Sequence, residues 1–91
     1  MPARDVWDEL EALGRAGNPE PRQIERLARR AGWVFSRMKG DHAIYKKEGF
    51  WANLSIPQRR LKRKTALHLL NVVEASLVEE ERESHDEEEG D

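Results

Sequence analysis

The chain has 91 residues, of which 37% are apolar and 37% are charged, and it contains no cysteine. A chain of this length supports one small core, which this composition confines to a few periodic segments. The absence of cysteine excludes disulfides, thiolate nucleophiles and cysteine-based zinc sites. We find no signal peptide and no apolar run near the roughly 20 residues of a membrane span, so we expect a cytoplasmic protein without membrane contact.

The net charge of −2 is unevenly distributed along the chain. Residues 79–91 carry nine acids and one base, whereas residues 1–78 carry nine acids and fifteen bases. A basic domain followed by an acidic segment is typical of a polyanion-binding domain with an interaction tail. We therefore expect an N-terminal helix and linker in residues 1–19, the main domain in residues 20–78, and a disordered acidic tail in residues 79–91.

Two helices are predicted before Gly32. Residues 5–15 and residues 21–31 each carry apolar side chains at helical spacing. These side chains are Val6, Trp7, Leu10 and Leu13 in the first segment, and Ile24, Leu27, Ala28 and Ala31 in the second. Residues 18–21 form a proline-containing linker, with Pro21 suited to the first helical turn, and Gly32 follows the second helix as its stop signal.

Three strands and a final helix are predicted after Gly32, which gives an α+β fold. Residues 33–38 and 42–46 form a hairpin around a turn at Lys39-Gly40-Asp41. Residues 50–56 alternate between apolar and polar side chains and form a third strand that ends at Pro57. Thr65 is the expected cap of the final helix. The apolar stripe of that helix consists of Ala66, Leu69, Leu70, Val72, Val73 and Leu77.

Four segments in this order carry a family resemblance. They are Ala31-Gly32-Trp33-Val34, Lys39-Gly40-Asp41-His42, Ser55-Ile56-Pro57 and Leu61-Lys62-x-x-Thr65-x-x-x-Leu69. Together they resemble the HicA (YcfA-type) toxin family over about residues 20–77. The resemblance implies a double-stranded-RNA-binding-like αβββα fold with both helices on one face of the sheet. It also implies a toxin that cleaves or blocks messenger RNA and is neutralised by a HicB-type antitoxin protein.

The chain departs from the family pattern near the expected site. Asp41 stands where the family usually has serine, and Lys64 stands where it usually has glycine. An acid beside His42 favours the imidazolium and repels a phosphate. The N-terminal helix and the acidic tail are additions to the minimal family. The alternative to a nuclease is therefore a non-catalytic nucleic-acid-binding or protein-interaction domain on the same fold.

His42 is the candidate catalytic residue. RNA supplies its own nucleophile, the 2′-hydroxyl, so cleavage needs proton transfer and charge stabilisation rather than a metal or a cofactor. Histidine can exchange a proton near neutral pH. Lys39, Lys46 and Arg37 are close enough in sequence to hold the phosphate. The structural alternative is that His42 is an ordinary polar hairpin residue packed beside Ile44.

The remaining candidate groups for chemistry are weaker. His68, on the final helix, and His85, in the acidic tail, are predicted to be surface residues. The histidines do not show a metal-ligand spacing, so no metal site is predicted. Ser36, Ser55 and Thr65 have no His/Asp partner nearby in sequence, which leaves nucleophilic triad chemistry unsupported.

A basic segment links the third strand to the final helix. It places five positive charges in six residues: Arg59, Arg60, Lys62, Arg63 and Lys64. In a fold of the double-stranded-RNA-binding kind, these side chains would meet backbone phosphates near a helix N-terminus. The alternative is a solvated basic loop. For the acidic tail, likewise, the alternatives are a solvated run and a competitor of RNA for the basic surface.

Four aromatic residues complete the expectations. Trp33, Phe35 and Phe50 are predicted to be core residues. Trp51 lies out of phase with the apolar face of the third strand. It can stack on an unpaired base, cover a partner protein, or pack with Trp7 under the N-terminal helix.

Overall fold

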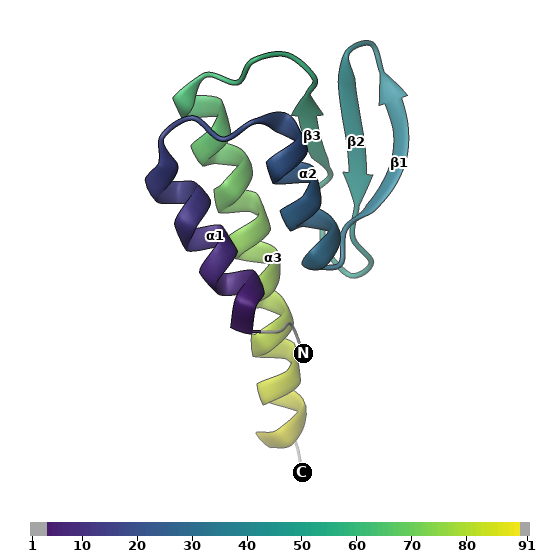
Figure 1. Ribbon diagram of the computed structural model, residues 1–91. Coiled ribbons are helices and arrows are strands. Elements are labelled where there is room, and N and C mark those ends of the chain that lie inside the picture. Colours follow the sequence, from purple (N-terminus) through teal and green to yellow (C-terminus); the bar gives the residue numbers. More distant parts are fainter. Residues whose placement is uncertain (1–3, 90–91) are drawn as a thin grey trace.

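Figure 1 shows the computed structural model, which describes residues 4–89 and the side chains of residues 5–82. The elements are α1 (Arg4–Ala16), α2 (Pro21–Arg30), β1 (Val34–Lys39), β2 (His42–Lys46), β3 (Leu54–Pro57) and α3 (Arg63–Glu89). The strands form one antiparallel sheet in the order β1-β2-β3. The prediction of an α+β domain with the order helix, three strands, helix, preceded by an additional helix, is confirmed.

The limits of α2 follow from local signals in the sequence. Pro21 occupies the first turn, and the Gln23 side chain accepts the backbone N–H of Glu20 at 2.8 Å in a capping box. After the helix, Gly32 has a φ of 99°, a conformation that glycine adopts without steric cost. This turn brings Trp33 into the core, where its backbone N–H donates to the Ala28 carbonyl at 2.9 Å.

The three helices lie on one side of the sheet (Figure 1). Helices α2 and α3 pack on the strands, and α1 packs on α2 and α3. One hydrophobic cluster joins all these elements, including Leu10 of α1, Leu27 of α2, Tyr45 of β2, Ile56 of β3 and Val73 of α3. Within residues 4–89, no helix combines the length and apolar character that a membrane crossing requires.

Helix α3 begins earlier than predicted. It starts at Arg63, and the backbone N–H of Ala66 donates to the Lys62 carbonyl at 2.9 Å, so Thr65 lies inside the helix and is not its cap. The side chain of Leu61, which is buried, anchors the chain just before this first turn. The predicted apolar stripe is buried, with Val72 at its edge packed against the core.

Helix α3 also continues further than predicted. The prediction of disorder is wrong for residues 79–89, which remain helical; residues 90 and 91 lie outside the described residues. The first reason is a buried contact: Lys47, whose side chain is only 10% exposed, donates to Glu80 at 2.9 Å. The second reason is that glutamate is a good helix former, and extending a packed helix avoids the cost of nucleation.

Two predictions on the strands are also wrong. The third strand spans only Leu54–Pro57, because β2 pairs with those four residues and the chain from 47 to 53 forms turns. Phe50 still packs edge-on against Trp33, with ring centroids 5.6 Å apart. Phe35 is 45% exposed rather than buried, because it lies on the edge strand β1, beyond the helices, and contacts Tyr45.

Candidate nucleic-acid interface

The face of the sheet that points away from the helices carries basic and polar side chains together with three apolar ones. In an antiparallel ladder, directly paired residues point to the same face. Ala43 pairs with Ile56, and Tyr45 pairs with Leu54, and all four belong to the core. The alternate positions of β2 therefore point outward. These positions and their partners on β1 and β3 are His42, Ile44, Lys46, Val34, Arg37, Lys39, Ser55 and Pro57.

His42 and its nearest cation share this outer face. Lys39 is the direct partner of His42 in the β1–β2 ladder, which places their Cα atoms about 5 Å apart. Arg37 pairs with Ile44 beside them. Ile44 is 6% exposed yet lies outside the core cluster, as expected for an apolar residue covered by the long side chains around it. Lys46, four residues from His42 along β2, is about 13 Å away.

A β-bulge at Ser36 gives β1 its orientation. The ladder runs from the Phe35–Tyr45 pair directly to the Arg37–Ile44 pair, which leaves Ser36 as an extra residue. Without the bulge, strict alternation from Phe35 would turn Arg37 toward the helix side. With it, Arg37 lies on the same face as His42, an example of a bulge that redirects side chains.

The side chain of His42 is 44% exposed and contacts Asp41, which in turn contacts Arg59. Its Nδ1 atom lies 3.0 Å from Oδ1 of Asp41. The other carboxylate oxygen, Oδ2, lies 2.8 Å from Nε of Arg59. The backbone carbonyl of Asp41 also accepts the N–H of Gln58 at 2.8 Å. These contacts join the β1–β2 turn to the segment that follows β3, so the basic segment begins beside the histidine.

The rest of the basic segment runs from this point to α3. It crosses the end of the molecule at which the β1–β2 turn lies (Figure 1). Arg60, Lys62, Arg63 and Lys64 are all exposed, and the last two occupy the first turn of α3. Cations are unfavourable at this end of a helix because the macrodipole is positive there. Helix stability therefore does not explain their presence, whereas a bound anion would.

The cations of the molecule divide into two groups. Those that face an acid within 4.0 Å are Arg15, Arg22, Arg26, Arg30, Lys47 and Arg59. Among side chains 5–82, those without an ion pair include Arg37, Lys39, Lys46, Arg60, Lys62, Arg63 and Lys64. The second group contains every predicted RNA-binding residue except Arg59. These charges are available to a polyanion without first breaking an internal pair.

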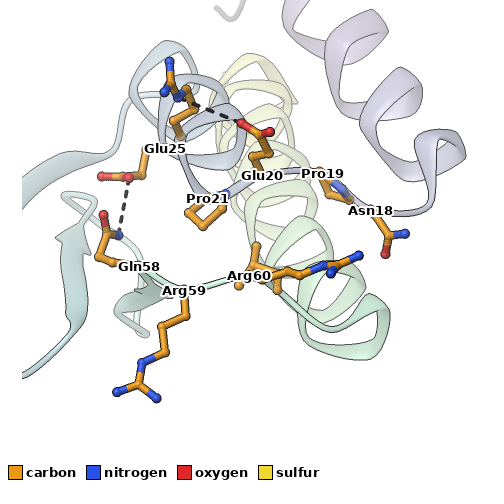
Figure 2. Close-up of a pocket in the computed structure, with 10 residues that line it drawn as sticks. Asn18, Pro19, Glu20, Pro21, Glu25, Gln58, Arg59 and Arg60 are labelled. Carbon is orange, nitrogen blue, oxygen red and sulfur yellow. Dashed lines mark hydrogen bonds and ion pairs between the residues drawn. The ribbon is translucent and has the colours of Figure 1, made fainter.

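A groove of about 580 Å³ lies next to the basic segment, and Figure 2 shows its lining. It is formed by the α1–α2 connection, the start of α2 and residues 58–61. Two of its three arginines lie beside acids: Arg22 lies 4.0 Å from Glu20 and Arg59 lies 2.8 Å from Asp41, whereas Arg60 has no ion pair among the described side chains. The Glu25 carboxylate accepts a hydrogen bond from Nε2 of Gln58 at 3.4 Å. The groove is thus less basic than the outer sheet face.

Beneath the outer face, Tyr45 is held by charged partners on α2. Its hydroxyl donates to Glu25 at 2.6 Å, and the Arg29 guanidinium lies 5.7 Å from its ring centroid. Burial, followed by the hydrogen bond to the Glu25 carboxylate, raises the pKa of Tyr45 to about 12. The phenol is therefore a structural donor at neutral pH, and it fastens β2 to α2.

The remaining candidate residues have the following positions. Trp51 is 89% exposed and contacts Phe50, which excludes packing with Trp7 under α1 and leaves base stacking and protein contact open. His68 lies on the exposed side of α3, as predicted, while the His85 side chain lies outside the described residues. Within the side chains that the structure describes, no three His, Asp or Glu residues form a metal-binding group.

Comparisons with family models, curated proteins and solved structures found no match to this chain. The case for function therefore depends on the geometry of the outer face. Sequence reasoning found His42, Lys39 and the basic segment, but it treated Asp41 only as an obstacle and missed the bulge at Ser36. No residue type at position 36 signals a bulge, whereas an acid adjacent to a histidine is a visible signal for an oriented imidazole.

Proposed function

We propose that this protein is an RNA-binding toxin of the HicA-like class and a metal-independent endoribonuclease that acts on messenger RNA. The proposal rests on one observation: His42 is half-exposed on a sheet face that it shares with the unpaired cations Arg37 and Lys39. A histidine sealed in the core would have been incompatible with it. The order of strands and helices is also compatible with the double-stranded-RNA-binding-like fold that the resemblance implies.

The proposed reaction uses the substrate's own 2′-hydroxyl. His42 accepts the hydroxyl proton through Nε2, the ring nitrogen that does not face Asp41. The 2′-oxygen then bonds to the adjacent phosphorus while the bond from phosphorus to the 5′-oxygen breaks. The leaving oxygen takes a proton from solvent, which yields a 2′,3′-cyclic phosphate and a 5′-hydroxyl end. Lys39 and Arg37 stabilise the negative charge that develops on the phosphoryl oxygens.

The basic segment supplies binding rather than chemistry in this proposal. Lys39 lies beside His42, Lys46 meets a phosphate further along the strand, and residues 59–64 hold the backbone on the other side. Contacts to phosphates give affinity with little sequence preference, so the nucleotides cleaved depend on other contacts. A HicB-type antitoxin protein is the proposed neutralising partner, because covering the outer face would block both functions.

Cleavage of a labelled single-stranded RNA by the full chain tests the proposal. In the presence of EDTA, the unmodified protein should produce 2′,3′-cyclic phosphate ends, and His42→Ala should lower the rate by about 100-fold or more. His68→Ala is the matched control, because it removes an exposed histidine from α3. Equal loss in both variants, or unchanged cleavage by His42→Ala, would contradict the assignment of His42.

A second candidate function is favoured by the exposed apolar groups. Trp51 is 89% exposed, and Val34 and Met38 on the edge strand β1 are also exposed. These side chains suit a protein-interaction domain or a non-catalytic nucleic-acid-binding domain. RNA binding without cleavage by the unmodified protein would favour the binding domain. Weak RNA binding together with a stable complex with another polypeptide would favour the interaction domain.

A further inference from the structure

The contacts of Asp41 suggest that this acid assists His42 instead of impairing it. One carboxylate oxygen lies 3.0 Å from Nδ1 of His42, and the other lies 2.8 Å from Nε of Arg59. A carboxylate accepts hydrogen bonds only, and a neutral imidazole has a single N–H. The negative carboxylate lies on the Nδ1 side of the ring and attracts a proton there, so it favours the tautomer that carries its proton on Nδ1. In that tautomer Nε2 is unprotonated and can act as a base.

We propose that Asp41 is a positioning residue that accepts the Nδ1–H of His42 and so presents Nε2 to the substrate, and that Arg59 neutralises the Asp41 carboxylate. The effects on RNA affinity and on cleavage rest on the proposed function, whereas the tautomer does not. Carboxylates that orient a histidine through its second nitrogen have the same role in metal sites and catalytic triads.

Arg59 resolves the expected conflict between Asp41 and a phosphate. An isolated carboxylate next to the scissile phosphate would repel it. With Arg59 at 2.8 Å the pair is neutral overall, so Lys39 and Arg37 determine the sign of the local potential. The backbone next to Arg59 is also fixed to the β1–β2 turn, because the Gln58 N–H donates to the Asp41 carbonyl at 2.8 Å.

Ring-nitrogen NMR of the ¹⁵N-labelled full chain tests the tautomer without any RNA. At a pH at which titration shows the ring to be neutral, His42 should have a protonated Nδ1 and an unprotonated Nε2. Asp41→Ala should shift the ring toward the Nε2-protonated form, while Asp8→Ala, which removes an exposed acid from α1, should not. The exposed His68 serves as an internal reference. Protonation of Nε2 in the unmodified protein, or no change in Asp41→Ala, would overturn the proposal.

RNA affinity tests the charge compensation. Arg59→Gln removes a cation and also leaves Asp41 uncompensated, so it should weaken binding more than Arg60→Ala, which removes an unpaired cation. Adding Asp41→Ala to Arg59→Gln should restore part of the lost affinity, because the two changes are coupled through one contact. Equal losses for Arg59→Gln and Arg60→Ala without this restoration would contradict the role of Arg59.

Cleavage separates the inference from the proposed function. If the protein is a nuclease, Asp41→Ala should lower kcat by about 10- to 100-fold with little change in KM. Unchanged backbone spectra would show that the variant remains folded. If the tautomer shifts as predicted but the unmodified protein does not cleave RNA, the positioning role stands and the nuclease proposal fails. If cleavage occurs and Asp41→Ala has no effect on kcat, the catalytic role of Asp41 is contradicted.

Discussion

The salt dependence of RNA binding follows from the division of cations into paired and unpaired groups. Each phosphate that a cation neutralises on a single strand lowers the slope of log K against log salt by about 0.7. Three unpaired cations lie on the outer face: Arg37, Lys39 and Lys46. Four more lie in the basic segment: Arg60, Lys62, Arg63 and Lys64. The structure thus gives two distinct expected slopes.

If RNA contacts the outer face alone, the slope should be about −2, which is about a 20-fold loss of affinity between 50 and 200 mM salt. If RNA also contacts the basic segment, the slope should approach −5, which is a loss of about 10³-fold over the same range. Fluorescence anisotropy at four or five salt concentrations distinguishes these values, with a labelled single-stranded RNA whose 2′-hydroxyls are methylated so that it cannot be cleaved. The measurement therefore reports how much of the basic surface takes part.

Two variants identify the cations responsible for the slope. Lys39→Ala should make the slope shallower by about 0.7, because Lys39 is unpaired and lies beside His42. Arg15→Ala should leave it unchanged, because Arg15 lies on α1 and faces Glu11 at 3.4 Å. A slope near zero for the unmodified protein would refute the reasoning. So would equal changes for the two variants, since binding would then follow total charge rather than the outer face.

Three further predictions concern stability. The pKa of Tyr45 rises from 10.0 to about 12 on folding, so the neutral phenol contributes roughly 2 to 3 kcal/mol to the free energy of unfolding. This contribution is complete below pH 10 and is lost between pH 10 and 12. In urea unfolding, Tyr45→Phe should remove this pH dependence. Glu80→Ala removes the carboxylate that pairs with the nearly buried Lys47 ammonium, and it should lower the free energy of unfolding by about 1 to 3 kcal/mol in chemical denaturation. Glu79 is exposed, so Glu79→Ala should lower it by less than about 0.5 kcal/mol. Deletion of Ser36, the unpaired bulge residue, keeps the pairs that β1 makes with β2 on both sides of the bulge, so it should change Tm and RNA affinity little. A loss of RNA affinity as large as that of Lys39→Ala would show that the bend in β1 is itself required.

The elements that could be predicted from sequence are those with local signals. Pro21 and Gly32 mark the limits of α2 by their own backbone preferences, and the structure places these limits as expected. The hairpin from residue 34 to residue 46 likewise has a glycine turn at Gly40, whose φ is 59°. In each case the deciding interactions lie within a few residues of one another.

The features that could not be predicted depend on partners distant in sequence. The end of α3 depends on Lys47, which contacts Glu80 across 33 residues. The length of β3 depends on how much of β2 is available for pairing. The face on which Arg37 lies depends on a bulge that alternation does not reveal. For the candidate site, the sequence thus identified His42 and its cations, whereas the register was needed to bring them onto one face.

The helical continuation of α3 also bears on the acidic residues that follow position 78. A helix rises 1.5 Å per residue, so residue 79 lies about 24 Å along the axis from Arg63. Figure 1 shows α3 extending away from the end that carries the basic segment. That separation exceeds the Debye length of about 8 Å at physiological salt. While α3 remains helical, its acids therefore cannot compete with RNA for residues 59–64, and Glu80 is engaged with Lys47 on the helix side of the sheet. The helical course of α3 thus keeps its acids after position 78 away from the basic segment that we propose for RNA.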